Sequence, residues 1–288
     1  MNPRATGWIL IALSAAAFGT LGVFVKLAYR ESVDPYSALA FRFVIATLIL
    51  APVAAIRRKP LPPASTLRNL FLFGSCGYVA HSLCYFTALR HASAGLVGLL
   101  LYLYPALVCL GGALFFGERL GRGRWIALGL ALAGTAMALS PGPGNHPLGI
   151  VLALSCAVIY GAYILACSRV ARGTDALTSA TVIIAGAAVI YGVTALVLRS
   201  PLPVTSDGWL LVAAIGVSTP IAIGALFAAM ERIGATSASV GSTLEPMVTV
   251  VLSFLFLDER LTVLQIAGGA MIIATVAWLA TRPPASSP

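Results

Sequence analysis

The sequence predicts an all-α integral membrane protein with ten transmembrane helices, arranged as two inverted repeats of five helices and with both termini in the cytoplasm. Three observations predict this architecture: the composition is strongly apolar, the chain repeats itself, and ten apolar stretches alternate with short polar breaks. Of the 288 residues, 59% are apolar and only 9% are charged, whereas soluble domains carry about 25% charged residues. Too little polar surface remains to cover a water-exposed globule, so a lipid bilayer is the expected solvent.

The repeat relates two stretches of the chain, residues 85–120 and 226–261, which align without a gap at a constant offset of 141. Ten aligned positions are identical, including Pro105 and Pro246. Because both stretches read as apolar helix, they predict a protein of two homologous halves, as in many transporters. The expected boundaries are a first repeat at 1–140, a linker at 141–146, a second repeat at 147–281 and a cytoplasmic tail at 282–288.

Ten stretches have the roughly 20 mostly apolar residues that a membrane span needs. The first has no small-residue cleavage site at the expected distance, so it is predicted to be a span and not a signal peptide. Proline, glycine and charge clusters separate the stretches. In chain order the predicted spans cover residues 7–29, 35–56, 67–89, 93–116, 122–140, 147–168, 176–198, 207–229, 235–257 and 262–281.

Basic residues give the orientation. Twelve Lys and Arg residues fall on the side of both termini and five on the other side, with Arg42 set aside because it lies within a span. Basic residues concentrate in cytoplasmic loops, so both termini are predicted to be cytoplasmic. The net charge of +9 has the same explanation, and nucleic-acid binding is not expected. Because each half has five spans, the second half enters the membrane from the opposite side, which makes the repeat inverted.

The residues that follow carry a family resemblance. Residues 8–26 read WILIALSAAAFGTLGVFVK, residues 35–43 read PYSALAFRF, and both Pro105 and Pro246 precede a Glu-Arg-Leu triplet. This doubled pattern resembles the drug/metabolite transporter superfamily, in particular its EamA family of ten-span bacterial carriers. The resemblance covers nearly the whole chain. It implies an inner-membrane carrier, generally an exporter of amino acids or related metabolites, with a substrate cavity between the two halves.

Span three carries an aromatic and polar stripe. Tyr78, His81, Ser82 and Tyr85 are spaced so that they share one helix face. Such a face would be costly against lipid, so it is expected to line a cavity or to bond to neighbouring helices. Span six carries Tyr160 and Tyr163 on one face, where they could stack on a substrate ring, bind a cation, or lie at the headgroup belt.

Glu245 is the one carboxylate near the middle of a predicted span. A charge at that depth costs roughly 2.5–3.5 kcal/mol on insertion scales, so Glu245 needs a partner, a proton or water. It could bind a substrate ammonium, couple transport to protons, or pair with a polar group on another helix. Arg42, within span two, could snorkel to the nearer surface, pair with a carboxylate, or bind a substrate carboxylate.

Small and hydroxyl residues line spans four and nine, where they favour close helix packing or a hydrated path. Pro105 and Pro246 are each expected to free a backbone carbonyl and kink the helix, and they are candidate hinges. The candidate substrate-binding residues are Tyr78, His81, Tyr85, Tyr102, Tyr160, Tyr163, Ser239, Ser242, Thr243 and Glu245.

The expected function is therefore a secondary carrier that exports amino acids, aromatic or other neutral ones included, or related metabolites by alternating access. Efflux of cationic or aromatic drugs is the alternative.

The five cysteines show no metal-site spacing, and no phosphate loop is present, so neither a metal nor a cofactor is expected. No span holds an aspartate near its centre, and Ser75 and His81 do not share a face, which argues against an intramembrane enzyme. The polar stripes differ between the halves, which argues against a symmetric channel. The sequence leaves the oligomeric state open, and a monomer is compatible with it.

Overall fold

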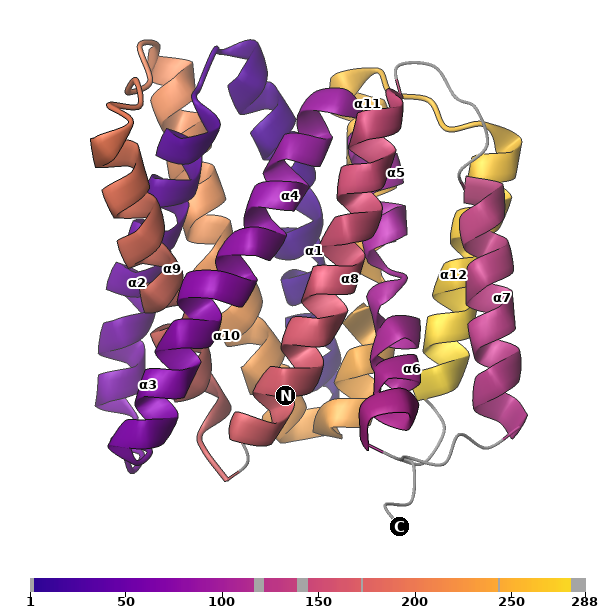
Figure 1. Ribbon diagram of the computed structural model, residues 1–288, viewed down its shortest axis with the longest axis horizontal. Coiled ribbons are helices and arrows are strands. Elements are labelled where there is room, and N and C mark those ends of the chain that lie inside the picture. The colour runs from indigo at the N-terminus through magenta and orange to yellow at the C-terminus, as the bar shows by residue number, and fades with distance from the viewer. Residues whose placement is uncertain (1–2, 117–121, 139–144, 172, 243, 281–288) are drawn as a thin grey trace.

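The computed structural model describes residues 3–116, 122–138, 145–171, 173–242 and 244–280, and every regular element in these ranges is a helix (Figure 1). The all-α class is therefore confirmed. In chain order the elements are α1 (Pro3–Arg30), α2 (Pro35–Ile56), α3 (Ala64–Phe73), the π-helical turn η1 (Gly74–Tyr78), α4 (Val79–His91), α5 (Ala94–Leu101), α6 (Tyr104–Phe116), α7 (Arg122–Ala138), α8 (Pro147–Val170), α9 (Ala176–Val197), α10 (Ser206–Ser242), α11 (Leu244–Leu257) and α12 (Val263–Ala280).

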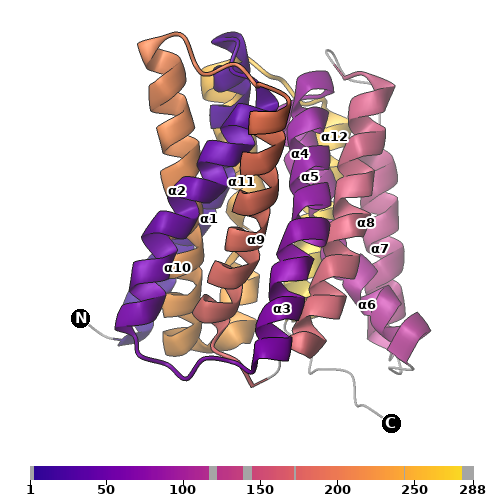
Figure 2. The same cartoon turned by 60° about the vertical axis from the view of Figure 1, so that its left-hand side comes forward.

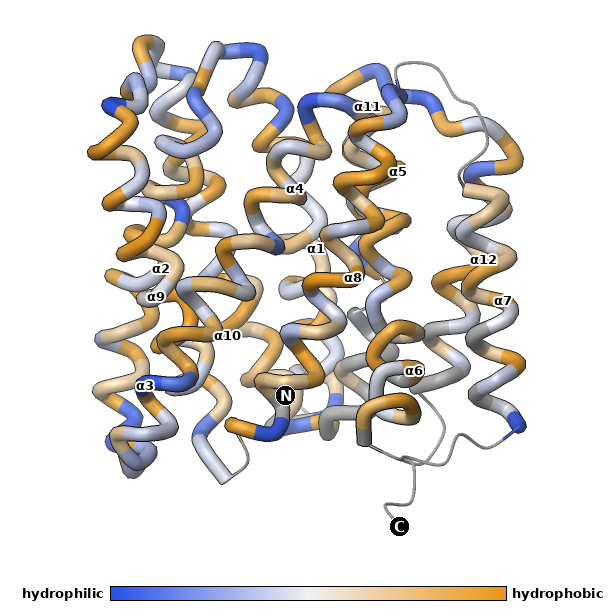
Figure 3. The backbone as a smooth tube through the Cα atoms, viewed as in Figure 1, coloured by the Kyte–Doolittle hydropathy of each residue, from blue (hydrophilic) through white to orange (hydrophobic). Residues whose placement is uncertain are grey.

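Seven helical stretches of the described chain are long and apolar enough to cross a membrane. One of them combines α3, η1 and α4, and another combines α5 and α6. Three shorter apolar helices accompany them, over Trp125–Ala138, Leu244–Leu257 and Val263–Thr275. Figure 3 shows apolar residues along the middle of the bundle and hydrophilic ones mostly towards its two ends. Large apolar side chains such as Leu48 and Leu196 are exposed, as expected for a surface that faces lipid.

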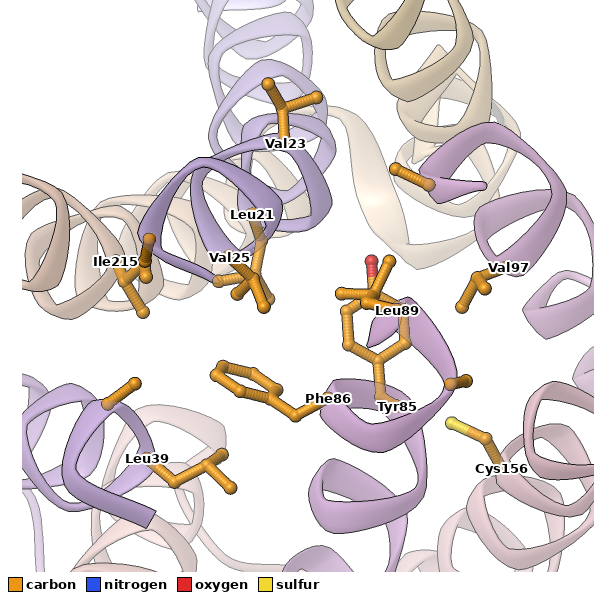
Figure 4. Packing of buried hydrophobic residues seen from close by; sticks show 14 of the residues in the cluster. Leu21, Val23, Val25, Leu39, Tyr85, Phe86, Leu89, Val97, Cys156 and Ile215 are labelled. Atoms are coloured by element: carbon orange, nitrogen blue, oxygen red, sulfur yellow. The ribbon is translucent and has the colours of Figure 1, made fainter. Parts of the chain in front are cut away.

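Helices from the two halves of the chain pack against each other (Figures 1 and 2). α1 packs on α10 and α11, α8 packs on α4 and α6, α2 packs on α9, and α7 packs on α12. Figure 4 shows part of the core, where Tyr85 and Phe86 of α4 lie between side chains of α1 and α2 on one side and Val97 and Cys156 on the other. The centre of the bundle is therefore built from residues far apart in the sequence.

Glycines permit backbone contact between α9 and the stretch that includes η1. A Cβ added at Gly74 would lie 2.0 Å from the carbonyl oxygen of Ile183, and one added at Gly186 would lie 2.4 Å from that of Phe71. Lipid tails are as apolar as leucine, so close van der Waals packing of small residues drives helix association in a membrane. The π-helical turn ends at Tyr78, and α4 begins at Val79.

Each proline lies in the first turn of a helix, and the predicted span 93–116 is interrupted between α5 and α6, just before Pro105. Pro105 is the second residue of α6, and Pro246 is the third residue of α11. A backbone N–H has no helical partner in the first turn, so proline is tolerated there. The expected break between residues 229 and 235 is also absent. α10 continues to Ser242, since residues 230–242 contain no proline to interrupt its hydrogen bonds.

Two aspartates cap helices at positions 141 residues apart. Asp34 accepts hydrogen bonds from the backbone N–H groups of Tyr36 and Ser37 at the start of α2. Asp175 accepts from the backbone N–H and the hydroxyl of Thr178, both at 2.9 Å, at the start of α9. Asp175 also lies 3.7 Å from Arg57. Partial burial opposes ionisation, but the Thr178 hydrogen bonds and the nearby Arg57 and Lys59 hold the pKa of Asp175 below its ordinary value.

Replacing Asp175 with alanine should lower the free energy of unfolding by about 1 kcal/mol, because the start of α9 loses its cap. Asp175→Asn should lower it less, since asparagine also caps. At neutral pH the free energy of unfolding should be higher for the wild type than for Asp175→Asn. This difference should be lost below about pH 4, as the carboxyl of the folded wild type takes up its proton. Thermal unfolding in detergent measures these differences. Asp207→Ala, at an exposed position, is the control and should change stability little.

Candidate functional site

A small cavity of about 80 Å³ lies at the centre of the bundle. Its lining comes from α1, α2, α4, α5, α6, α8 and α11, with Tyr78 of η1 and with Tyr102 just beyond α5. The residues that line it are Phe18, Leu21, Arg42, Tyr78, His81, Tyr85, Leu101, Tyr102, Tyr104, Tyr160 and Glu245. The cavity thus combines one cation, one carboxylate, an imidazole and five tyrosines.

Six of the ten predicted site residues line this cavity: Tyr78, His81, Tyr85, Tyr102, Tyr160 and Glu245. Tyr163 is not in the lining; it packs beside Tyr78 and Tyr160, with ring centroids 5.7 and 5.9 Å away. The hydroxyl of Ser242 donates to the carbonyl of Ala238, within its own helix. Thr243 and the side chain of Ser239 lie outside the described residues.

Five lining residues were outside the predicted set: Phe18, Leu21, Arg42, Leu101 and Tyr104. Two of them carry a signal in the sequence. Arg42 is a charge within an apolar span, and Tyr104 is the repeat counterpart of Glu245. Phe18, Leu21 and Leu101 resemble every other apolar residue of their spans, so no sequence pattern separates them.

Glu245 is the second residue of α11, where the partial positive charge of a helix N-terminus favours a carboxylate. Its Oε2 accepts a hydrogen bond of 3.1 Å from the hydroxyl of Tyr102. The same hydroxyl also contacts the backbone carbonyl of Ser242, so its single proton is shared between the two acceptor oxygens. The pairing of Glu245 with a polar group on another helix therefore exists, and that group belongs to the other half of the chain.

Arg42 does not reach the membrane surface, contrary to the expectation of snorkelling. The residue is only 4% exposed. Its Nε donates to the hydroxyl of Thr219 at 3.0 Å. The guanidinium lies 4.8 Å from the ring centre of Phe43 and 5.6 Å from that of Phe86, within reach of cation–π attraction. A buried cation is thus held by a neutral hydroxyl and by aromatic faces.

Aromatic rings form one wall of the cavity. The rings of His81 and Tyr160 are stacked with centroids 4.4 Å apart, and Tyr104 meets Tyr160 edge-on at 4.7 Å. Nδ1 of His81 lies 3.2 Å from Sγ of Cys156, which holds the imidazole in place. Offset and edge-on ring pairs are favourable arrangements, and such a wall can accept a flat or apolar substrate group.

A second, larger hollow of about 660 Å³ lies at the end of the bundle where α1 ends, uppermost in Figure 1. We call it the vestibule. Lys26, Arg30 and Glu259 are in its lining. Nζ of Lys26 lies 2.5 Å from Oε1 of Glu259, and Oε2 of Glu259 accepts from the backbone N–H of Ala94 at 2.7 Å. Glu259 thereby links α1, the start of α5 and the turn after α11.

Small residues pack tightly along these same helices, and Gly22 and Thr249 lie between positions that line the cavity and positions that line the vestibule. The hydroxyl of Thr249 donates to the carbonyl of Gly19 at 3.0 Å. A Cβ added at Gly19 would lie 2.8 Å from Val248, and one added at Gly22 would lie 2.9 Å from the hydroxyl of Tyr85. The central cavity is therefore separated from the vestibule by a glycine-rich seam and the Lys26–Glu259 pair.

The chain is similar to known transporters. The chain is 26% identical to the uncharacterized transporter YcbK of Bacillus subtilis, covering 96% of this chain and 93% of that one. It is 28% identical to the aromatic amino acid exporter YddG of Ancylobacter novellus, covering 75% of this chain and 72% of that one. A solved crystal structure shares the fold, with a TM-score of 0.65 and 24% identity over 95% of this chain and 96% of the other.

The profile of one protein family matches the chain twice, over residues 5–140 and 147–281. The two matches span nearly all of the described helices, including every element that contributes to the central cavity. The chain belongs to the EamA-like transporter family.

Proposed function

We propose that this protein is a secondary transporter of the bacterial inner membrane that exports amino acids or related metabolites by alternating access. The observation that carries the proposal is the central cavity, whose described lining holds a cation and a carboxylate beside aromatic rings. The proposed partners are the lipid bilayer and a small solute, and the proposed oligomeric state is a monomer. Because the chain belongs to a transporter family, an enzymatic function has no support.

The proposed architecture is ten spans in two inverted repeats, residues 1–140 and 147–281, joined by a linker at 141–146 and followed by a cytoplasmic tail at 282–288. The packing supports it. In the repeat, α8 corresponds to α1 and α10 to α4, so the α1–α10 contact corresponds to the α8–α4 contact. The α2–α9 and α7–α12 contacts each join a helix to its own counterpart, so the exchange leaves them unchanged. Asp34 and Asp175, which cap α2 and α9, are also counterparts in the repeat.

The helix directions also support inversion. The backbone N–H of His146, just before α8, donates to the carbonyl of His91, the last residue of α4. Residues 91–94 lie at the upper end, since Ala94 bonds to Glu259. α8 therefore starts at the end where α1 finishes (Figure 1). The proposed placement of both termini in the cytoplasm rests on the twelve-to-five distribution of basic residues.

Alternating access is supported by the size of the cavity and by its closure. Ligand sites usually measure about 300–1,000 Å³, so a cavity of about 80 Å³ is contracted and must widen to admit an amino acid. The seam and the Lys26–Glu259 pair close it from the vestibule. We propose Pro105 and Pro246 as hinges, because each lies in the first turn of a helix beside the cavity and lacks the backbone N–H that would tie it to the preceding turn.

The proposed solute follows from the lining and from the relatives. A relative is named an aromatic amino acid exporter, and the wall of His81, Tyr104 and Tyr160 suits an aromatic or other neutral side chain. Efflux of cationic or aromatic drugs is the second candidate, because Glu245 and the tyrosines would also suit a lipophilic cation.

Purified protein in liposomes should exchange labelled phenylalanine or another neutral amino acid in a counterflow assay. Uptake should depend on unlabelled amino acid inside the vesicles and exceed that of empty liposomes. Leu196→Ala, on the exposed face of α9, is the control and should transport like the wild type. Uptake of a quaternary cation without uptake of any amino acid would contradict the proposed substrate class and favour drug efflux instead.

Tyr160→Ala should lower phenylalanine transport at least tenfold, because the ring that stacks with His81 and meets Tyr104 is lost. Tyr160→Phe keeps the ring and should retain most of the activity. The initial rate of counterflow at equal protein density measures both. Equal loss in the alanine and phenylalanine variants would mean that the hydroxyl matters and the ring wall does not.

Glu259→Gln should open the cavity to the vestibule more often, since it removes the charge that holds Lys26. A cysteine placed at Leu101, in a variant without the native cysteines, reports on this opening. It should react severalfold faster with a membrane-impermeant thiol reagent added on the vestibule side. Glu31→Gln is the matched control, because Glu31 bonds to Thr205 and not across the seam. An unchanged labelling rate in Glu259→Gln would contradict the closing role.

A further inference from the structure

Two opposite charges line the central cavity, and they do not pair with each other. The ion pairs described in the structure are Lys26–Glu259 and Arg57–Asp175, and none joins Arg42 to Glu245. Burying a lone charge in a membrane protein is costly, and direct pairing would offset that cost. A purely structural role would favour such pairing. Keeping the two charges apart in one cavity therefore calls for another explanation.

Each charge is held by a neutral hydroxyl and keeps bonding capacity to spare. Arg42 has five N–H donors, and of these only Nε–H has a hydrogen-bond partner in the described chain, the hydroxyl of Thr219. Glu245 accepts from Tyr102 through Oε2, while its Oε1 has no donor among the described residues. No fully buried side-chain nitrogen or oxygen in the described part lacks a hydrogen-bond partner, so the free groups of both residues reach open space.

The spare groups match the two ends of an amino acid. The planar guanidinium fork of arginine fits a carboxylate through two parallel hydrogen bonds. The carboxylate of Glu245 suits an ammonium group. The Tyr160, His81 and Tyr104 wall lines the same cavity and leaves a place for a side chain. A ligand with only one charge would leave the other protein charge buried without a partner.

We infer that Arg42 and Glu245 form one bipolar site, in which Arg42 binds the carboxylate and Glu245 binds the ammonium of a zwitterionic amino acid. The inference rests on the proposed function and narrows it to substrates that carry both groups. It argues against lipophilic cations, because Arg42 would repel them.

The test compares an amino acid with two analogues that each lack one charge. Unlabelled phenylalanine, 2-phenylethylamine and 3-phenylpropionate compete against labelled phenylalanine in counterflow. In the wild type, phenylalanine should compete at least tenfold better than either analogue. Alanine, ethylamine and propionate repeat the comparison with a small side chain.

Charge-neutral variants assign the two ends. Arg42→Gln should weaken competition by phenylalanine and phenylpropionate at least tenfold and leave that by phenylethylamine nearly unchanged. Glu245→Gln should weaken phenylalanine and phenylethylamine and spare phenylpropionate. Arg42→Lys and Glu245→Asp keep the charges and should keep the order of preference. A merely structural role would weaken all three competitors equally.

The outcomes separate this inference from the proposed function. If the wild type takes up no amino acid, the proposed amino acid export fails and the inference fails with it. If the wild type takes up an amino acid but its amine or acid analogue competes equally well, the proposed function stands and the bipolar site is wrong. The wild-type comparison decides this even if Arg42→Gln and Glu245→Gln do not fold.

Discussion

The structure depends on how it satisfies two charges at the centre of an apolar bundle. Arg42 belongs to the first half of the chain and bonds to Thr219 in the second. Glu245 belongs to the second half and accepts from Tyr102 in the first. Neither half can therefore satisfy its own central charge. Because such groups are costly to leave unpaired in hydrocarbon, both partners are satisfied only when the halves are docked, and the site is completed in the same step.

Closure of the site toward the vestibule relies on contacts that are individually weak. The side chains of Lys26 and Glu259 are 23% and 13% exposed, and ion pairs near water contribute only about 0–1 kcal/mol. The seam beneath them consists of glycines against Thr249, Val248 and Tyr85. These contacts involve little side-chain interlocking. A barrier of this kind can separate and form again without unfolding a helix, which suits a carrier that must open many times.

Much of the fold followed from the sequence, because apolar length and breaker residues act locally. The predicted starts at Pro35, Pro147 and residue 176 coincide with α2, α8 and α9. Where the structure departs from prediction, the breaker residues act differently than expected. Residues 230–242 contain no proline to interrupt the hydrogen bonds of α10, which therefore continues to Ser242. The interruption after α5 falls within a predicted span, just before Pro105.

The same reasoning explains which site residues could be found. Tyr78, His81 and Tyr85 were found because a polar face has to turn away from lipid. Tyr163 has the same spacing signal as Tyr160, yet it packs behind the cavity wall; spacing defines a face only relative to its own helix. Arg42 was assigned several possible roles because its depth alone could not reveal Thr219 and the rings of Phe43 and Phe86. Thr219 and Phe86 belong to other helices, and the position of Phe43 relative to Arg42 depends on the rotation of α2 itself.

The proposed exchange of the two halves does not extend to the site. By the offset of 141, the counterpart of Arg42 is Ile183, an apolar residue whose backbone carbonyl packs against Gly74. The counterpart of Glu245 is Tyr104, which lines the same cavity. Each charge therefore occurs once, and the positive and negative ends of the cavity keep their order when the carrier changes state. In the proposed alternating-access cycle, the two states would therefore place different residues around the substrate and differ in free energy. The two directions of access would be unequal, although the proposed repeat relates the two halves.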